Sequence, residues 1–273
     1  LERRMLVERH LISREHEEAE GARGVALRDD ESVSIMVNVE DHLRLQALQS
    51  GLELEKAWAV VDAADTELGR IFDLAYDGRL GFLTACPTNV GTGLRASVML
   101  HQPALVMSRH IEKAFRAIAK LNLAVRGFYG EGTEALGDFY QISNQLTLGR
   151  SETELLEDLK AVIGQVVNYE LAARQGLIKK DRAKLEDRIW RSYAILANAR
   201  IIASEEAMAH LSSVRLGIQT GLLSGIRISA VNEAFLLSQP AHLQELAGNE
   251  LSPEERDVAR ADLLRRILAN GKS

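Results

Sequence analysis

The hydrophobic pattern of the chain changes at Ser151, and this change constrains the fold more than any other feature. Before Ser151, short alternating apolar segments and glycine-rich turns predict strands mixed with helices. Ser151 is followed three residues later by Glu154, the capping-box pattern of a helix start, and helical periodicity dominates the rest of the chain. We therefore predict an α+β domain over residues 1–170 and an all-helical domain over residues 171–273.

The first domain is expected to contain several strands and helices. The period-two patterns predict strands at 32–37, 78–85, the stretch from 123, and 139–145, and the helical patterns predict helices at 51–72, 96–107 and 108–121. Pro103 disfavours helix in the residue before it, so the last two helices should be broken there. Residues 1–12 are read as the end of a helix and residues 13–30 as a surface loop.

Composition excludes several classes of protein. A net charge of −6 over 273 residues argues against broad nucleic-acid or membrane-surface binding, and no apolar run is long enough to cross a bilayer. A single cysteine cannot form an internal disulfide, so we expect a cytoplasmic protein. The chain begins at Leu1 without a methionine and with a charged helical segment, and we expect that a preceding part has been lost.

The stretch 86–97 holds the only cysteine, Cys86, followed by a proline, two glycines and Arg95. A small-residue loop brings backbone N–H groups close to an anion, and the helix expected after it would add its positive dipole end. Arginine suits a phosphate because its guanidinium donates a fork of hydrogen bonds. On its own, the stretch is more often a tight turn before a buried helix.

Reactive side chains gather at three strand ends or loops. They are Glu40, Asp41, His42 and Arg44 in the first, Cys86 and Arg95 in the second, and Arg126 and Glu131 in the third. Arginines stabilise a phosphoryl group in transfer, while carboxylates hold a guanidinium and accept its proton. One cysteine and scattered histidines lack metal-ligand spacing, so no metal site is predicted in the protein itself. Nucleophilic catalysis by Cys86 stays open, with His42 or His101 as the basic partner.

The same three stretches resemble, in order, the signature stretches of the guanidino (phosphagen) kinases. They are Asn38-x-Glu-Asp-His-Leu-Arg44, Cys86-Pro-Thr-Asn-Val-Gly-Thr-Gly-x-Arg95-Ala-Ser-Val98 and Arg126-Gly-x-x-Gly-Glu131. Within that superfamily the chain is most similar to the bacterial protein-arginine kinases, through Arg95-Ala-Ser-Val-Met-Leu-His101, the run from Tyr129 and the helical C-terminal region. The resemblance implies a phosphagen-kinase-like antiparallel sheet flanked by helices, followed by an all-α domain.

The resemblance also implies a role for individual residues. Glu40 matches the general base that grips the target guanidinium, Glu131 the second carboxylate, and Cys86 the thiol beside the guanidinium. ATP, carried with Mg²⁺, is expected at His10, Arg44, Arg95, Ala96, Ser97, Val98, Met99, Arg126, Gly127 and Gly130.

A further motif in the helical region, Arg256-Asp257-Val-Ala-Arg260-Ala261, resembles the R-D-x-x-R-A element of the protein-arginine kinases. It implies an allosteric phosphoarginine-binding pocket made by Arg256, Asp257, Arg260 and Ala261. Arg256 and Arg260 lie one turn apart and could grip a phosphate while Asp257 faces a guanidinium. Without the family context, an exposed helix with ordinary charge pairs is the more common interpretation.

The implied activity is phosphorylation of arginine side chains in proteins, with a role in stress regulation. The resemblance implies protein substrates that include a transcriptional repressor, tagging for a Clp-type protease, a zinc-containing activator and a homodimer. Three departures bear on activity: Val39 stands where the family has a glutamate, Gln102 where it has leucine, and no Ser-Ser-Arg-x-Arg segment is found. Two alternatives remain, a kinase for free arginine or another small guanidine, and a catalytically dead phosphoarginine-binding module.

Overall fold

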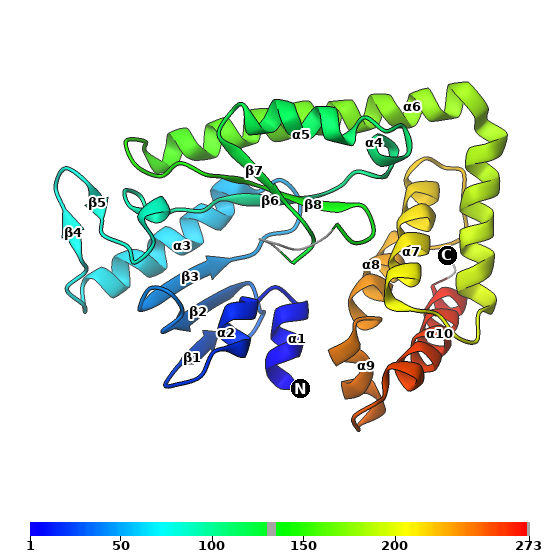
Figure 1. The fold of residues 1–273 in the computed structure, drawn as a ribbon, viewed down its shortest axis with the longest axis horizontal. Helices are drawn as coiled ribbons and strands as arrows, with labels where there is room; N and C mark the ends of the chain where they lie inside the picture. Colours follow the sequence, from blue (N-terminus) through cyan, green and yellow to red (C-terminus); the bar gives the residue numbers. More distant parts are fainter. Residues whose placement is uncertain (130–134, 272–273) are drawn as a thin grey trace.

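The computed structural model describes residues 1–129 and 135–271. Its first half contains two three-stranded antiparallel sheets and a two-stranded one, with helices against them, and its second half is a group of helices (Figure 1). One long helix, α6 (Glu152–Asn198), runs along the sheets and then turns down into the helical half. The predicted order of an α+β region followed by helices is therefore confirmed.

The first sheet has the order β1-β2-β3, made by β1 (Gly24–Leu27), β2 (Val33–Val37) and β3 (Leu43–Ala47). Two short helices, α1 (Glu2–Glu8) and α2 (Arg14–Glu18), precede it, and α3 (Leu54–Gly69) follows it. The strand at 32–37 and the helix at 51–72 are confirmed. The segment 13–30 is more ordered than the expected loop, because it contains α2 and β1, whose pairing with β2 cannot be deduced from local pattern.

The second sheet has the order β6-β8-β7, made by β6 (Ser97–His101), β7 (Leu123–Arg126) and β8 (Phe139–Asn144). Its two connecting helices are α4 (Pro103–Met107) and α5 (Ile111–Ala119). The strands predicted from 123 and at 139–145, and the helix at 108–121, are confirmed. The strand predicted at 78–85 is reduced to β5 (Gly81–Phe82), which pairs with β4 (Tyr76–Asp77).

The helix predicted over 96–107 is wrong for its first part and confirmed for its second, α4. Residues 97–101 form β6, paired antiparallel with β8, and helix begins only at Pro103. Short apolar runs do not distinguish the two structures, and pairing with a strand about forty residues away decides the outcome. The loop 86–96 is therefore followed by strand β6. The helix expected directly after the loop, and with it the helix dipole, is absent.

Helix α6 is two helices joined at a kink. Asp181 has φ −161° and ψ 79°, and its Oδ1 accepts a hydrogen bond from the backbone N–H of Lys184 at 3.2 Å. Asp181 therefore acts as an N-cap within the chain, which redirects the second segment. The capping box predicted at Ser151 and Glu154 is confirmed. The domain boundary near Glu170 stays a prediction, and in the structure α6 continues through that residue.

The α+β half and the helical half each have an apolar core. One core lies between the second sheet, α3 and the first part of α6, with Ile142, Leu159 and Ile163 fully buried. The other lies among the second part of α6, α7 (Ser204–Gln219), α8 (Ile228–Leu237) and α10 (Pro253–Asn270). The remaining helix, α9 (Pro240–Ala247), lies beside α1 (Figure 1). No helix in the described part of the chain is both long and apolar enough to cross a membrane.

Candidate active site

The second sheet turns one face toward the core and the other outward. Across the three strands, Val98, Ile142 and Val125 share one row and pack into the apolar core. Because successive side chains alternate, the neighbouring row of Met99, Gln141 and Arg126 lies on the opposite face. This pattern puts the guanidinium of Arg126 on the outward face.

The residues predicted to bind a nucleotide at the start of β6 divide between these faces. Ser97 is exposed and accepts a hydrogen bond from Nε2 of Gln141 at 2.8 Å, and Met99 is also exposed. Ala96 is buried and Val98 packs against the core, so on the outward face these two residues offer only backbone groups to a ligand.

Glu40 lies in the tight turn between β2 and β3. Asn38, with φ 57°, opens this turn and its N–H donates to the carbonyl of His42 at 2.9 Å. Glu40 is exposed, and beside it Oδ1 of Asp41 accepts a hydrogen bond from the backbone N–H of Ala85 at 2.6 Å. That bond joins the first predicted stretch to the second, next to Cys86.

Cys86 and Arg95 meet at the hydroxyl of Thr88. Sγ of Cys86 lies 3.0 Å from Oγ1 of Thr88, and Nη2 of Arg95 donates to the same oxygen at 3.2 Å. Nε of Arg95 donates to Oδ1 of Asn89 at 2.8 Å. The short helix Pro87–Asn89 therefore holds the guanidinium in place from two sides, while Arg95 stays exposed.

Two polar residues hold the loop 88–96 in place: Asn144, the last residue of β8, and Thr147, shortly after the strand. Oγ1 of Thr147 donates toward the carbonyls of Thr88 at 3.0 Å and Val90 at 2.7 Å. Asn144 accepts from the N–H of Ala96 at 2.8 Å and donates to the carbonyl of Leu94 at 3.0 Å. Both side chains are buried, so they set the loop without facing a ligand.

Gly91 explains why this loop needs glycine. Its φ is 115°, and a Cβ there would lie 2.4 Å from the carbonyl oxygen of Thr147. The close approach of the two backbones excludes any side chain.

Electrostatics show that the three stretches converge on Arg44. Desolvation by the surrounding protein lowers the pKa of Arg44, although part of the side chain is exposed to solvent. The charges of Glu15 and Glu40 raise its pKa, whereas the guanidiniums of Arg95 and Arg126 lower it. Three guanidiniums that act on one another make a site for a polyanion, because a bound polyanion relieves their mutual repulsion.

His10 contacts two aromatic residues that follow Arg126 in the chain. It has φ 59°, and its ring centroid lies 5.2 Å from that of Phe128 and 5.6 Å from that of Tyr129. Burial lowers the pKa of His10, which favours the neutral ring. Phe128 and Tyr129 follow Arg126 closely in the chain. Together with His10 they form an aromatic group that suits the flat face of a nucleotide base. Gly127, between Arg126 and Phe128, is buried.

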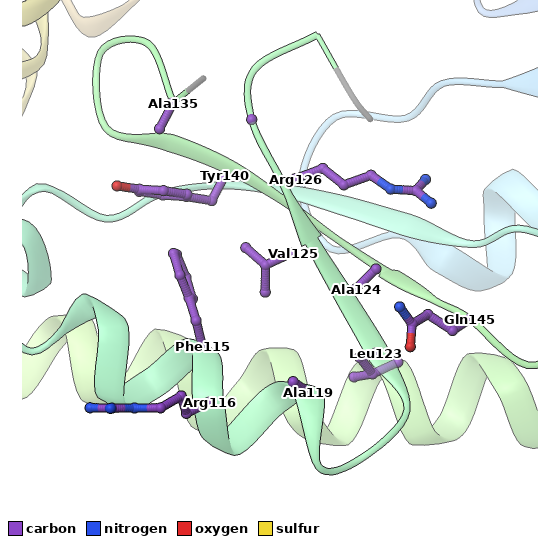
Figure 2. A pocket seen from close by; sticks show the side chains of 11 residues that line it. Phe115, Arg116, Ala119, Leu123, Ala124, Val125, Arg126, Ala135, Tyr140 and Gln145 are labelled. Atoms are coloured by element: carbon purple, nitrogen blue, oxygen red, sulfur yellow. The ribbon is translucent and has the colours of Figure 1, made fainter. Parts of the chain in front are cut away.

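A cavity of about 480 Å³ lies between β7 and α5, where the rings of Phe115 and Tyr140 meet edge to face at 4.7 Å. Figure 2 shows Val125 pointing toward Phe115, while Arg126 leaves the strand on the other side. Arg126 and Gly127 also line this cavity, but its lining includes Phe115, Arg116 and Ala119 of α5, behind the sheet from the arginine cluster, so the cavity is not assigned to the site.

Two predicted residues, Gly130 and Glu131, lie outside the described residues. The R-D-x-x-R-A element lies in α10, in the helical half. Arg260 is 2% exposed, and its guanidinium donates to the carbonyls of Ser238 and Ile202, both at 2.9 Å, and to Asp257 at 2.5 Å. Arg256 is partly exposed and donates to the carbonyl of Leu251 at 2.8 Å. Phosphoarginine binding by these residues stays a prediction.

Sequence reasoning missed the supporting residues Asp41, Thr88, Asn144 and Thr147 as a group. Asp41 and Thr88 lie within the predicted stretches, but their contacts with Ala85 and Arg95 could not be read from the motifs. The available signal for Asn144 and Thr147 was weak, since polar residues after an apolar strand are common in exposed loops.

Comparisons with known proteins identify the family. Residues 1–173 match the model of the ATP:guanido phosphotransferase C-terminal catalytic domain, and residues 182–273 match that of the protein-arginine kinase McsB C-terminal domain. The protein-arginine kinase of Moorella thermoacetica is 51% identical over 269 residues, which cover 98% of this chain and 77% of that protein. That of Halalkalibacterium halodurans is 51% identical over 263 residues, 96% and 74% of the two chains.

Solved structures show the same fold. A crystal structure of lombricine kinase superposes with a TM-score of 0.52 at 29% identity, over 63% of this chain and 51% of that one. The duplicated taurocyamine kinase of Schistosoma mansoni, with bound transition state analog components, gives a TM-score of 0.55 at 24% identity, over 75% of this chain and 30% of that one. The phosphagen-kinase-like fold is thus confirmed, and the chain belongs to the protein-arginine kinases, a family of ATP:guanido phosphotransferases.

Proposed function

We propose that this chain transfers the γ-phosphoryl group of ATP to arginine side chains of proteins. The observation that carries the proposal is the convergence of Arg44, Arg95 and Arg126, with Glu40 in electrostatic reach of Arg44 and joined through Asp41 to the loop of Cys86. The relatives at about half identity are named protein-arginine kinases, which supports a protein-bound guanidinium as the acceptor.

The chemistry requires a base and a positive cradle. A guanidinium is a poor nucleophile until it loses a proton, and Glu40 is the carboxylate proposed to take it. The freed nitrogen lone pair forms the N–P bond while the bond from the γ-phosphorus to the bridging oxygen breaks, and ADP leaves with that electron pair. The arginines stabilise the charge on the phosphoryl oxygens, and Cys86 lies beside the acceptor.

Magnesium fits this site only as a companion of the nucleotide. Among residues 1–129 and 135–271, no group of three or more His, Cys, Asp or Glu side chains is arranged to hold a metal ion, and one oxygen of Asp41 already accepts from Ala85. Mg²⁺ in kinase sites takes most ligands from phosphates and water. When bound, it would neutralise charge on the β- and γ-phosphates.

The helical half supports a second element of the proposal. Arg256 and Asp257 are partly exposed and form the pair available to a phosphoarginine, while Arg260 is buried and holds Asp257. The family membership also supports cytoplasmic, dimeric action on protein targets, including a transcriptional repressor, with a zinc-containing activator and delivery to a Clp-type protease in stress.

Incubation of the chain with labelled ATP and either an arginine-rich protein or free arginine tests the proposal. Acid-labile phosphate on the protein is the expected product. Label on free arginine alone would favour the small-guanidine kinase instead. Absence of label on both substrates, with phosphoarginine still bound by the chain, would favour the binding module.

A further inference from the structure

The linker between α8 and α9 is buried and polar. Ser238 and Gln239 are 1% and 3% exposed. Nε2 of Gln239 donates to the carbonyl of Phe235 at 2.9 Å, and its Oε1 accepts from the hydroxyl of Tyr129 at 2.8 Å. Because the amide nitrogen is fixed within the helical half, the amide oxygen is directed at Tyr129, which follows β7 in the other half.

Helix α9 is capped from outside its own half. Gln239 is the N-cap residue but makes no side-chain cap. Instead, the carboxylate of Glu8, at the end of α1, accepts from the N–H of Ala241 at 2.7 Å and of His242 at 3.1 Å. A carboxylate in this place satisfies unpaired N–H groups and is favoured by the helix dipole.

His242 extends this contact to the residue before His10. Its Nδ1 lies 2.6 Å from Oε2 of Glu8, and its Nε2 accepts from Nε of Arg9 at 3.1 Å. Since Nε2 is the acceptor, Nδ1 carries the proton and donates to Glu8. The ring is 3% exposed, so the arrangement is enclosed.

The contacts made by Gln239 and by His242 both lead to the aromatic group of His10, Phe128 and Tyr129. Tyr129 is held by Gln239, and the end of α1 is held by His242, while the ring of His10 lies 5.6 Å from that of Tyr129 and 5.2 Å from that of Phe128. The linker is fixed from its other side by Arg260, whose Nε donates to the carbonyl of Ser238. The position of the His10 and Tyr129 rings therefore depends on the helical half.

We propose that α9 is a positioning element for nucleotide binding, with Gln239 and His242 as positioning residues that touch neither ATP nor the acceptor. The inference rests on the proposed function, because it takes the His10 face as the site of the nucleotide base. Its consequence is that loss of a contact in the helical half weakens nucleotide binding while the phosphate-binding arginines stay in place.

The test compares the ADP affinity, in the presence of Mg²⁺, of the full chain with four variants: Gln239→Met, Tyr129→Phe, their double variant and Gln244→Met. Gln244 is a matched control, because it is 6% exposed, lies in α9 and bonds to Pro240 and Leu251 within the helical half. We expect each single variant at the Gln239–Tyr129 contact to weaken ADP binding about fivefold, the size of one neutral hydrogen bond. The double variant should be no weaker than Gln239→Met, and Gln244→Met should bind as the parent does.

Comparing KM for ATP with kcat separates a positioning effect from a general loss of folded enzyme. KM for ATP should rise in Gln239→Met and Tyr129→Phe while kcat stays within about twofold, and Tyr129→Phe keeps the ring and so the fold. Equal weakening by Gln244→Met, or unchanged affinity in both Gln239→Met and Tyr129→Phe, would overturn this inference alone. Failure of the unmodified chain to bind ADP would contradict the proposed function and this inference with it.

Discussion

Asp41 accepts a hydrogen bond from the backbone N–H of Ala85 at 2.6 Å, and through it the turn that carries Glu40 is joined to the loop that carries Cys86. We expect Asp41→Ala to lower kcat about tenfold, because the proposed base loses its register with the acceptor site. Asp41→Asn keeps an oxygen acceptor and should retain most activity. Equal kcat in both variants, measured at saturating ATP, would argue against a positioning role.

Thr88 places its hydroxyl between the thiol of Cys86 and the guanidinium of Arg95. Thr88→Val removes the acceptor of one Arg95 hydrogen bond, and we expect KM for ATP to rise about threefold to fivefold. Thr220→Val is the control, since that hydroxyl bonds only to carbonyls of its own helix α7. The control should leave KM unchanged, and a rise of the same size in both variants would contradict the assignment.

Gly91 and Gly93 both have positive φ, but only Gly91 meets a neighbouring backbone. Gly91→Ala places a methyl group against the carbonyl of Thr147, and we expect a loss of about 3 kcal/mol or more in the free energy of unfolding. Gly93→Ala carries only the cost of positive φ, about 1 kcal/mol. Urea unfolding of the two variants measures the difference, and equal losses would show that the close approach is relieved elsewhere.

Part of the fold and of the candidate site could be predicted from the sequence. The helix start at Ser151 was predicted from capping chemistry, which is a local signal, whereas a common phosphate site for Arg44, Arg95 and Arg126 was implied by the family resemblance. The role of Thr147 under Gly91, and the strand at Ser97–His101, were not predicted, since both depend on contacts with residues distant in the chain. The buried state of Arg260 was equally hidden, because an arginine in an R-D-x-x-R-A pattern has the spacing of an exposed ion pair.

Arg256 and Arg260 should separate binding from stability. Arg260→Ala leaves two buried carbonyls and Asp257 without their donor, and we expect a loss of about 3 kcal/mol in the free energy of unfolding. The free energy of unfolding of Arg256→Ala should lie within about 1 kcal/mol of the parent value. The same variant should lose affinity for a phosphoarginine peptide, measured by calorimetry. Retained peptide affinity in Arg256→Ala would remove the allosteric pocket from the proposal.

His101 predicts a pH dependence of stability. Burial, followed by the charges of Arg215 and Arg174, lowers the pKa of His101 to about 2, and its Nε2 lies 2.9 Å from Oγ of Ser212, which donates to Asp138. The unfolded chain takes up a proton on this ring below about pH 6.5 and the folded chain does not, so stability present above that pH falls as pH is lowered.

The loss attributable to His101 is at most about 1.4 kcal/mol per pH unit. We expect His101→Gln to reduce the slope of unfolding free energy between pH 7 and pH 5, whatever its effect at pH 7. The exposed His110→Gln is the control, and an unchanged slope in His101→Gln would show that other groups cause the acid sensitivity.

Detection of phosphoarginine on a protein substrate tests the central claim most directly. Mass spectrometry after incubation of an arginine-rich protein with ATP, Mg²⁺ and the chain should find phosphate on arginine side chains, and Glu40→Gln should reduce its rate by about a hundredfold or more, whereas the exposed Glu20→Gln should not. Phosphoarginine formed at the parental rate by Glu40→Gln, or no phosphate on the arginine side chains of the protein, would contradict the account.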